Sequence, residues 1–203
     1  MNFRRGRQMI VHDPGLMASA RPDETPPLPA VQLTPPVAWR RWTVHPRNSV
    51  GFILGRVNEV IDGAGGAIDA LHFMGHGSPG GISIGRGRID ADDVPGFEPL
   101  RDKVRVIVFF SCSVGGEHRS GGWSRTQPTT IGRRISDATG ATVVVAQQDQ
   151  TYSYNRQVRI INFGPWEGPV DVYAPGTSAT YNAHNPFRRE PQLDLERLIF
   201  GGR

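Results

Sequence analysis

The stretch VRVIVFF at residues 104–110 constrains the fold more than any other part of the chain. Six of its seven side chains are apolar. A strand that is apolar on both faces is typical of the middle of a parallel sheet, because helices cover both sides of such a sheet. We therefore expect residues 104–110 to form a central strand of an α/β domain.

Further strands and helices are predicted on both sides of this segment. Short apolar runs predict strands at residues 8–12, 39–45, 67–74 and 142–146. Apolar residues with helical spacing follow a predicted N-cap at Asn48-Ser49, and again follow Thr129 or Thr130 up to Gly140. Strands that alternate with helices imply βαβ units. The predicted fold class is therefore α/β, with a mainly parallel sheet flanked by helices.

The pattern changes beyond residue 155. The segments VRIINF and PVDVYA predict a C-terminal hairpin or lid, and the polar tail from residue 182 ends in the amphipathic turn LDLERLIF. Residues 21–37 contain six prolines, which favour an extended arm. We expect residues 1–155 to form the core with this arm, and residues 156–203 to form a hairpin and tail packed on or near it.

Charge and hydropathy limit the partners to be expected. The net charge is +4, and of 23 basic residues only Lys103 is a lysine, which leaves 22 arginines. The arginines are scattered rather than arranged in a stripe with aromatic residues, so we expect no nucleic-acid partner. No apolar run approaches the roughly 18 residues of a membrane span.

The beginning of the chain and its cysteine content bear on its compartment. The arginine-rich first residues are not followed by the apolar segment of a secretory signal, so we expect a cytoplasmic protein. Delivery to another cell by a dedicated secretion system stays open. The single cysteine, Cys112, rules out an intramolecular disulfide and a cysteine-based zinc cluster.

Two residues at predicted strand ends are candidates for catalysis. His76 follows the strand at residues 67–74, and Cys112 follows the strand at residues 104–110. Functional groups of parallel α/β sheets gather at the carboxyl ends of strands. A nearby imidazole can accept the proton of a thiol and so activate it as a nucleophile. Gly77 would let the backbone approach a substrate closely and offer an amide N–H to an oxyanion.

The order of these motifs resembles a known family. The block LHFMGHG precedes VIVFFSC, and Cys112 follows His76 by 36 residues. This arrangement resembles the caspase-like (clan CD) cysteine peptidases, a group that includes caspases, metacaspases, gingipains, legumain, separase and the bacterial CHAT domains. The wider run of about residues 8–155 is most similar to an uncharacterised bacterial branch of that group.

The resemblance implies a caspase-like fold and a role for each matching residue. His76 would be the general base and acid, Cys112 the nucleophile, and the backbone amides of Gly77 and Cys112 the oxyanion hole. The substrate would be a protein or peptide, and no cofactor is expected. Such families often set their P1 preference near the next strand, where Gln148 and Asp149 stand here, and Asp149 would favour a basic P1 residue.

The chain also departs from caspases in two respects. Ser111 stands where caspases carry alanine before the cysteine, and no second subunit is evident in the sequence. The second departure leaves dimerisation and the oligomeric state open. A caspase-like scaffold that has lost activity and binds protein partners is the alternative function.

Two other chemistries fit the sequence poorly. A phosphatase loop has the pattern Cys-x5-Arg, whereas six residues separate Cys112 from Arg119. His72 and His76 have the spacing of a metal-binding pair, but they lie on a strand and its exit, with no glutamate after His72. We therefore expect no metal, and we expect His72 to be a packed or hydrogen-bonded core residue.

Overall fold

The structure is a computed structural model of the chain. It describes residues 7–13, 15–16, 40–115, 130–150, 152–155, 160–163, 168–182 and 195–200. The proline-rich segment at residues 21–37 and most of the tail after residue 182 lie outside the described residues.

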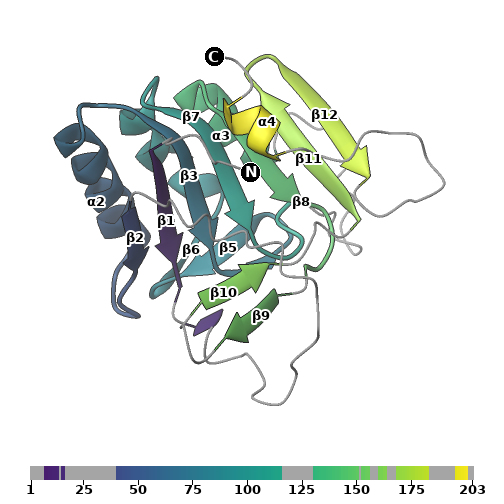
Figure 1. Cartoon of the computed structure of the whole chain (residues 1–203), viewed down its shortest axis with the longest axis horizontal. Coiled ribbons are helices and arrows are strands. Elements are labelled where there is room, and N and C mark those ends of the chain that lie inside the picture. Colours follow the sequence, from purple (N-terminus) through teal and green to yellow (C-terminus); the bar gives the residue numbers. More distant parts are fainter. Residues whose placement is uncertain are drawn as a thin grey trace.

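A seven-stranded mixed sheet forms the centre of the fold (Figure 1). The strands, in their order across the sheet, are β12 (Thr177–Asn182), β11 (Pro169–Ala174), β8 (Thr142–Ala146), β7 (Val104–Phe110), β3 (Ile68–Met74), β1 (Gln8–His12) and β2 (Arg40–Thr43). The last five in that order run parallel, whereas β11 is antiparallel to both β8 and β12. The predicted α/β class with a mainly parallel sheet is confirmed, and β7 is the middle strand.

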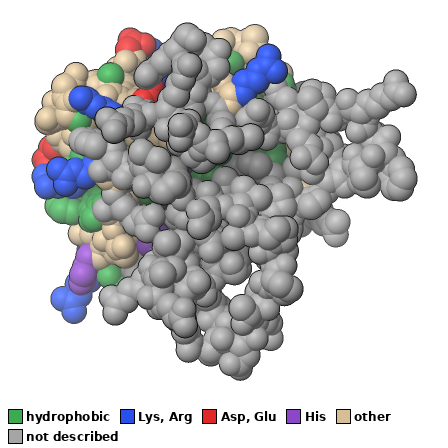
Figure 2. Space-filling model, viewed as in Figure 1, with side chains coloured by type: hydrophobic (Ala, Val, Ile, Leu, Met, Phe, Trp, Pro, Cys, Tyr) green, Lys and Arg blue, Asp and Glu red, His purple; other side chains and the backbone are tan. Residues whose placement is uncertain are grey.

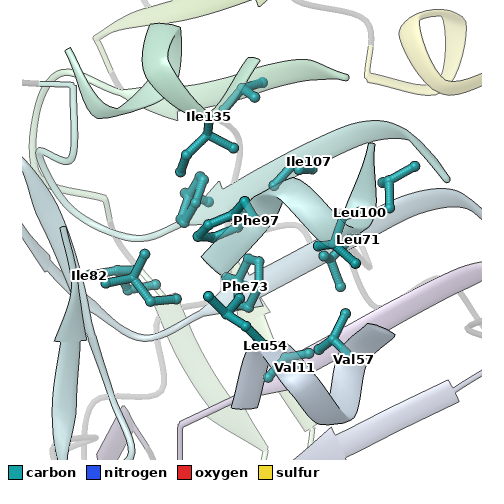
Figure 3. Packing of buried hydrophobic residues seen from close by; sticks show 14 of the residues in the cluster. Val11, Leu54, Val57, Leu71, Phe73, Ile82, Phe97, Leu100, Ile107 and Ile135 are labelled. Atoms are coloured by element: carbon teal, nitrogen blue, oxygen red, sulfur yellow. The ribbon is translucent and has the colours of Figure 1, made fainter. Parts of the chain in front are cut away.

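Three helical segments pack on one face of this sheet, and a fourth packs on the other. The first face carries α2 (Val50–Gly63), the 3₁₀ helix η1 (Ala91–Leu100) and α3 (Ile131–Thr139). Their apolar side chains meet those of the strands in one buried cluster, which Figure 3 shows around Phe73 and Phe97. The second face carries α4 (Leu195–Phe200), whose Ile199 belongs to a separate buried cluster. The sheet therefore has apolar side chains buried on both faces.

Capping residues set the ends of α2 and α3. The hydroxyl of Ser49 accepts a hydrogen bond from the Phe52 amide at 3.3 Å, and the hydroxyl of Thr130 accepts one from the Arg133 amide at 3.4 Å. Gly140 ends α3 in the left-handed conformation, with φ of 72°. These contacts satisfy backbone groups that a helix end leaves without an intrahelical partner. Two of the caps predicted from sequence are thereby confirmed, and Thr130 rather than Thr129 caps α3.

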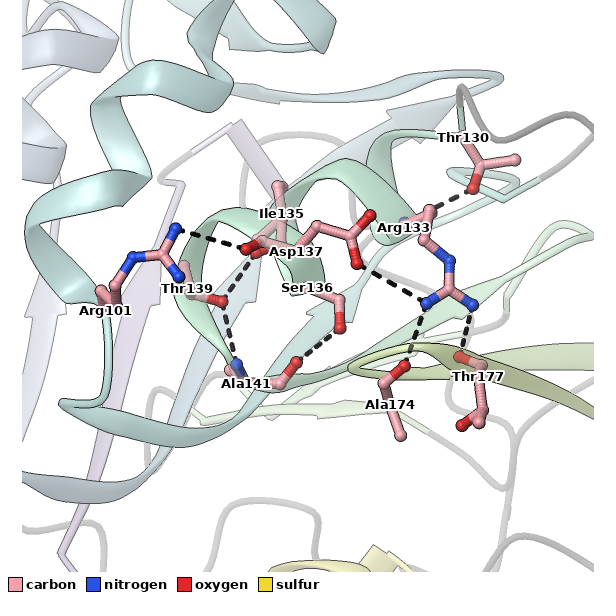
Figure 4. A network of polar contacts seen from close by, with 10 residues as sticks. All are labelled: Arg101, Thr130, Arg133, Ile135, Ser136, Asp137, Thr139, Ala141, Ala174 and Thr177. Carbon is pink, nitrogen blue, oxygen red and sulfur yellow. Dashed lines mark hydrogen bonds and ion pairs between the residues drawn. The ribbon is translucent and has the colours of Figure 1, made fainter.

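Polar contacts tie α3 to the hairpin of β11 and β12 (Figure 4). The guanidinium group of Arg133 donates to the carbonyl of Ala174 at 3.0 Å and also to the carbonyl of Thr177. It lies over the ring of Tyr173, 5.3 Å from the ring centroid. Helix α3, which precedes β8 in the chain, is thus fixed against β11 and β12.

The C-terminal strands pair differently from the predicted hairpin. VRIINF contains β10 (Ile160–Phe163), which pairs with β9 (Tyr152–Asn155), while PVDVYA is β11 and pairs with β8 and β12. The two segments therefore do not form a hairpin with each other. A tight turn at Pro175 and Gly176 joins β11 directly to β12, and such short turns favour pairing of the strands they connect. The main sheet draws strands from both sides of residue 155.

The sequence pattern predicted no element at residues 91–100, where the structure has η1. Its residues Pro95 and Pro99 lack the amide N–H that a helix interior uses. The segment nevertheless winds into 3₁₀ turns that start at a capping box of Asp90 and Asp93. It buries Val94, Phe97 and Leu100 against the sheet. Tertiary packing of these three side chains therefore outweighs the poor helical propensity of the segment.

Small antiparallel strands lie where the parallel strands end. The strands β4 (His76–Ser78), β5 (Gly81–Ile84) and β6 (Gly87–Ile89) form one sheet, and β9 and β10 form another. Figure 1 draws β9 and β10 beyond the lower ends of the parallel strands, which are their carboxyl ends. The candidate site lies at this edge.

On the face drawn in Figure 2, the described positive side chains do not form a single patch. These Lys and Arg side chains stand at several separate places, with acidic and apolar groups between them. In the described part of the chain, no helix has the length and apolar character needed to cross a membrane.

Candidate functional site

The sheet topology brings His76 and Cys112 to neighbouring strand ends. Their strands β3 and β7 are adjacent and parallel, with Met74 opposite Phe110 at the last paired position. His76 and Cys112 each lie two residues beyond that pair, and both are half-buried. Neighbouring strands of a sheet are only about 4.8 Å apart. The two predicted catalytic residues therefore leave the sheet side by side.

Direct backbone contact joins the two segments at Gly77. A Cβ atom at Gly77 would lie 1.9 Å from the carbonyl oxygen of Cys112 and 2.8 Å from its amide nitrogen. Any side chain at this position would overlap the backbone of Cys112, so only glycine allows this approach. The two amides expected to form an oxyanion hole thus belong to segments that touch.

Hydrogen bonds from two sides hold the turn that follows Cys112. The Ser113 amide donates to the carbonyl of Gln148 at 2.9 Å, and the Gly80 amide donates to the carbonyl of Val114 at 3.1 Å. Ser113 itself has φ of 51°, in the left-handed region that non-glycine residues seldom adopt. A backbone in such a conformation persists where its surroundings hold it, and the segments on both sides do so here.

The sulfur of Cys112 contacts Gln150, a residue that the sequence analysis did not single out. The Gln150 amide N–H donates to Sγ at 3.4 Å, and the Cys112 thiol donates to the Gln150 carbonyl oxygen at 3.6 Å. Gln150 is buried, with 8% of its surface exposed. One feature of the sequence pointed to Gln150. It lies in a polar segment that follows the strand at residues 142–146, and that segment holds three glutamines.

The two candidate substrate-binding residues lie in the same segment. Asp149 is exposed, and its carboxylate accepts a hydrogen bond from the Ser113 hydroxyl at 2.8 Å. Gln148 is also exposed, and its carbonyl accepts the Ser113 amide. The structure thus brings both residues to the turn that carries Cys112. Their role in choosing a P1 residue stays a prediction.

Ser111, which replaces the alanine of caspases, faces the interior. Its side chain is buried, with 1% of the residue exposed, and its hydroxyl has no hydrogen-bond partner among the described residues. The hydroxyl therefore faces away from solvent although the next residue is half-exposed. Ser111 therefore packs beneath the site and is not one of the groups that a substrate would touch.

His72 is a core residue, as predicted. Its Nε2 atom lies 2.8 Å from Oε1 of Gln8, and its ring stacks on Phe110 with centroids 5.5 Å apart. Burial lowers the pKa of His72 to about 4, so the ring is neutral at pH 7. Among the described residues, no group of three His, Cys, Asp or Glu side chains is placed to hold a metal ion.

A groove lies at the opposite edge of the sheet. It has a volume of about 720 Å³ and is lined by residues at the starts of β3, β7 and β8, including Asp69, Lys103 and Thr142. None of the predicted site residues lines this groove. We favour the carboxyl edge as the candidate site, because Cys112, His76 and Gly77 lie there and none of them lines the groove.

No protein-family model matches the chain, and no curated protein is significantly similar to it. Membership of the caspase-like group therefore stays a prediction. The carboxyl edge carries a thiol and an imidazole at neighbouring strand ends, and the backbone of Gly77 lies against that of Cys112. Such an arrangement is suited to acyl transfer through a covalent thioester.

Proposed function

We propose that this chain is a caspase-like cysteine endopeptidase that uses His76 and Cys112 as a catalytic dyad. The observation that carries the proposal is the contact of Gly77 with the backbone of Cys112 at the carboxyl ends of β3 and β7. The contact brings together the segments that carry Cys112, His76 and the two amides, and the proposal gives these groups the roles of nucleophile, base and oxyanion donors. These are the parts that peptide-bond cleavage by a thiol requires.

The first half of the reaction forms an acyl-enzyme. His76 accepts the Cys112 proton, and the sulfur bonds to the carbonyl carbon of the scissile peptide. The amides of Gly77 and Cys112 donate to the oxygen, which becomes negatively charged as the tetrahedral intermediate forms. The carbon–nitrogen bond then breaks, and the imidazolium of His76 gives its proton to the departing amine. A thioester on Cys112 remains.

The second half releases the acid product. His76 accepts a proton from a water molecule, whose oxygen attacks the thioester carbon. The carbon–sulfur bond breaks, Cys112 recovers a proton, and a carboxylic acid leaves. No cofactor takes part in either half.

Asp149 supplies the proposed preference for a basic P1 residue. An Arg or Lys side chain of the substrate would gain a charge-assisted hydrogen bond worth roughly 1.5–3 kcal/mol, which is about 10- to 150-fold in kcat/KM. We expect Asp149→Asn to lose activity selectively on basic-P1 peptides while other peptides keep their rates. Profiling both proteins on one peptide library checks this, and an unchanged P1 profile would remove Asp149 from the pocket.

A mass measurement tests the proposal as a whole. The purified chain is incubated with a library of thiol-reactive peptidyl inhibitors, and intact mass is recorded. We expect one addition to the wild-type chain and none to Cys112→Ala. On any peptide that the inhibitor profile selects, Cys112→Ala should abolish cleavage, and His76→Ala should slow it by roughly a thousandfold or more.

A second histidine provides the matched control. His45 is exposed and follows the edge strand β2, two strands away from β3. His45→Ala should therefore keep wild-type activity. Full activity in Cys112→Ala would end the peptidase proposal. A folded wild-type chain that reacts with no inhibitor and cleaves no peptide would favour the alternative, an inactive scaffold that binds protein partners.

A further inference from the structure

We propose that Gln150 is a positioning residue that favours the thiolate form of Cys112. The contact of its main chain with Sγ carries this inference, which rests on the proposed function only in taking Cys112 as the reactive group. Gln150 follows β8, whereas Cys112 follows β7, so the adjacent strands bring the two residues together.

The main chain of Gln150 offers the sulfur both a donor and an acceptor. The neutral thiol donates to the Gln150 carbonyl at 3.6 Å, and this bond is lost when the proton leaves. The Gln150 N–H donates to Sγ at 3.4 Å, and this bond strengthens when the sulfur carries a negative charge. A hydrogen bond to the charged form lowers the pKa of the group that accepts it. The carbonyl favours the neutral thiol, but a thiol is a weak donor. The bond from the N–H to a charged sulfur is the stronger of the two, so the main chain of Gln150 favours the thiolate.

The side chain of Gln150 holds that N–H in place. Its Nε2 atom donates to the carbonyl oxygens of Gln148 and Asp149, at 3.1 Å each. Gln148 is in turn held by the Ser113 amide, one residue after the nucleophile. The side-chain amide thus closes the turn at residues 148–150 onto itself. Gln150 acts on Cys112 through this turn and not through its side chain.

The consequence for catalysis concerns the amount of nucleophile. A cysteine with an ordinary pKa near 8.5 is ionised to only a few per cent at pH 7, and the thiolate is the reactive form. A donor fixed at the sulfur raises that fraction before a substrate arrives. Loss of the Gln150 side-chain amide should loosen the turn and reduce the thiolate fraction.

Alkylation kinetics test this directly, because Cys112 is the only cysteine in the chain. The rate of reaction with iodoacetamide is measured against pH for the wild type and for Gln150→Met, which keeps the length of the side chain but has no amide. We expect the midpoint for Gln150→Met to lie higher by about 1 pH unit, which is about tenfold slower alkylation below both midpoints. Gln150→Glu should raise the midpoint further, because a carboxylate cannot donate and adds negative charge.

Glu59→Gln is the control for this measurement. Glu59 is an exposed residue of α2 that pairs with Arg56, and its replacement should leave the midpoint unchanged. Thermal unfolding of each variant shows whether it is folded. An unchanged midpoint in a folded Gln150→Met chain would overturn the proposal.

A measurement on the wild-type chain decides the question if the variants fail to fold. The amide proton shift of Gln150 in ¹⁵N-labelled protein is followed against pH. We expect it to titrate with the midpoint found by alkylation, and to lose that step in Cys112→Ala. A Gln150 amide that does not respond to ionisation of Cys112 would refute the inference. Neither measurement needs a substrate, so a failed peptidase test and a failed Gln150 test remain distinguishable.

Discussion

At the scale of residues, glycines at the site differ from other glycines in the room left for a Cβ atom. A Cβ atom at Gly77 would overlap the carbonyl of Cys112, whereas one at Gly51 in α2 would meet nothing within 4 Å. We expect Gly77→Ala to shift the backbone of Cys112, the proposed nucleophile, and to lower kcat/KM for the proposed peptidase activity by about a hundredfold. Gly51→Ala should keep its activity and gain roughly 0.5–1 kcal/mol in helix stability. Wild-type rates in Gly77→Ala would contradict the contact.

His72 makes stability depend on pH. Its pKa is about 4 in the folded chain and 6.5 as an ordinary value, so the unfolded chain binds more protons between these limits. The contribution of His72 to the free energy of unfolding is therefore fully present above pH 6.5 and is lost as the pH drops toward 4. The loss is at most about 3 kcal/mol. Urea unfolding of the wild type and His72→Gln from pH 8 to 4 checks this. Parallel stability curves for the two proteins would contradict it.

At the scale of elements, α3 leads into β8, the strand that precedes Gln148 and Asp149. The C-terminal end of α3 depends on Gly140. The φ of 72° there would cost a side chain roughly 1–2 kcal/mol. A Cβ atom would also lie 3.1 Å from the Asp102 carboxylate. We expect Gly140→Ala to lower the free energy of unfolding in urea by that amount. The control is Gly63→Ala at the end of α2, where φ is not positive and nothing lies within 4 Å, and it should not destabilise.

Elements whose local pattern matches their environment could be predicted from the sequence. The strand at residues 104–110 and the helix after Ser49 are of this kind, because apolar periodicity and a cap are properties of a few adjacent residues. The pairing of β11 and the 3₁₀ turns of η1 could not be predicted. They depend on which distant strand or face is available to bury Val170 or Phe97.

At the scale of the whole molecule, β11 completes the sheet that carries the site. Val170 and Val172 are buried beside Val144 and Ala146 of β8, and Asp171 is buried as it accepts hydrogen bonds from Gln147 and Thr180. We expect a fragment of residues 1–155 to aggregate or to unfold without cooperativity, because β8 would expose a long apolar edge. Urea unfolding followed by circular dichroism, beside the full chain, checks this. Cooperative unfolding of the fragment at full-length stability would show that β11 is dispensable.

The sequence by itself determined the strands that lead to His76 and Cys112, because strand patterns and turn residues are local and the carboxyl-edge rule holds for any parallel sheet. Only the tertiary structure decided which strands are neighbours, how closely Gly77 approaches Cys112, and that Gln150 meets the sulfur. These contacts join residues 35 to 38 positions apart in the chain. No local pattern encodes them, because they arise from the packing of whole elements around a shared core.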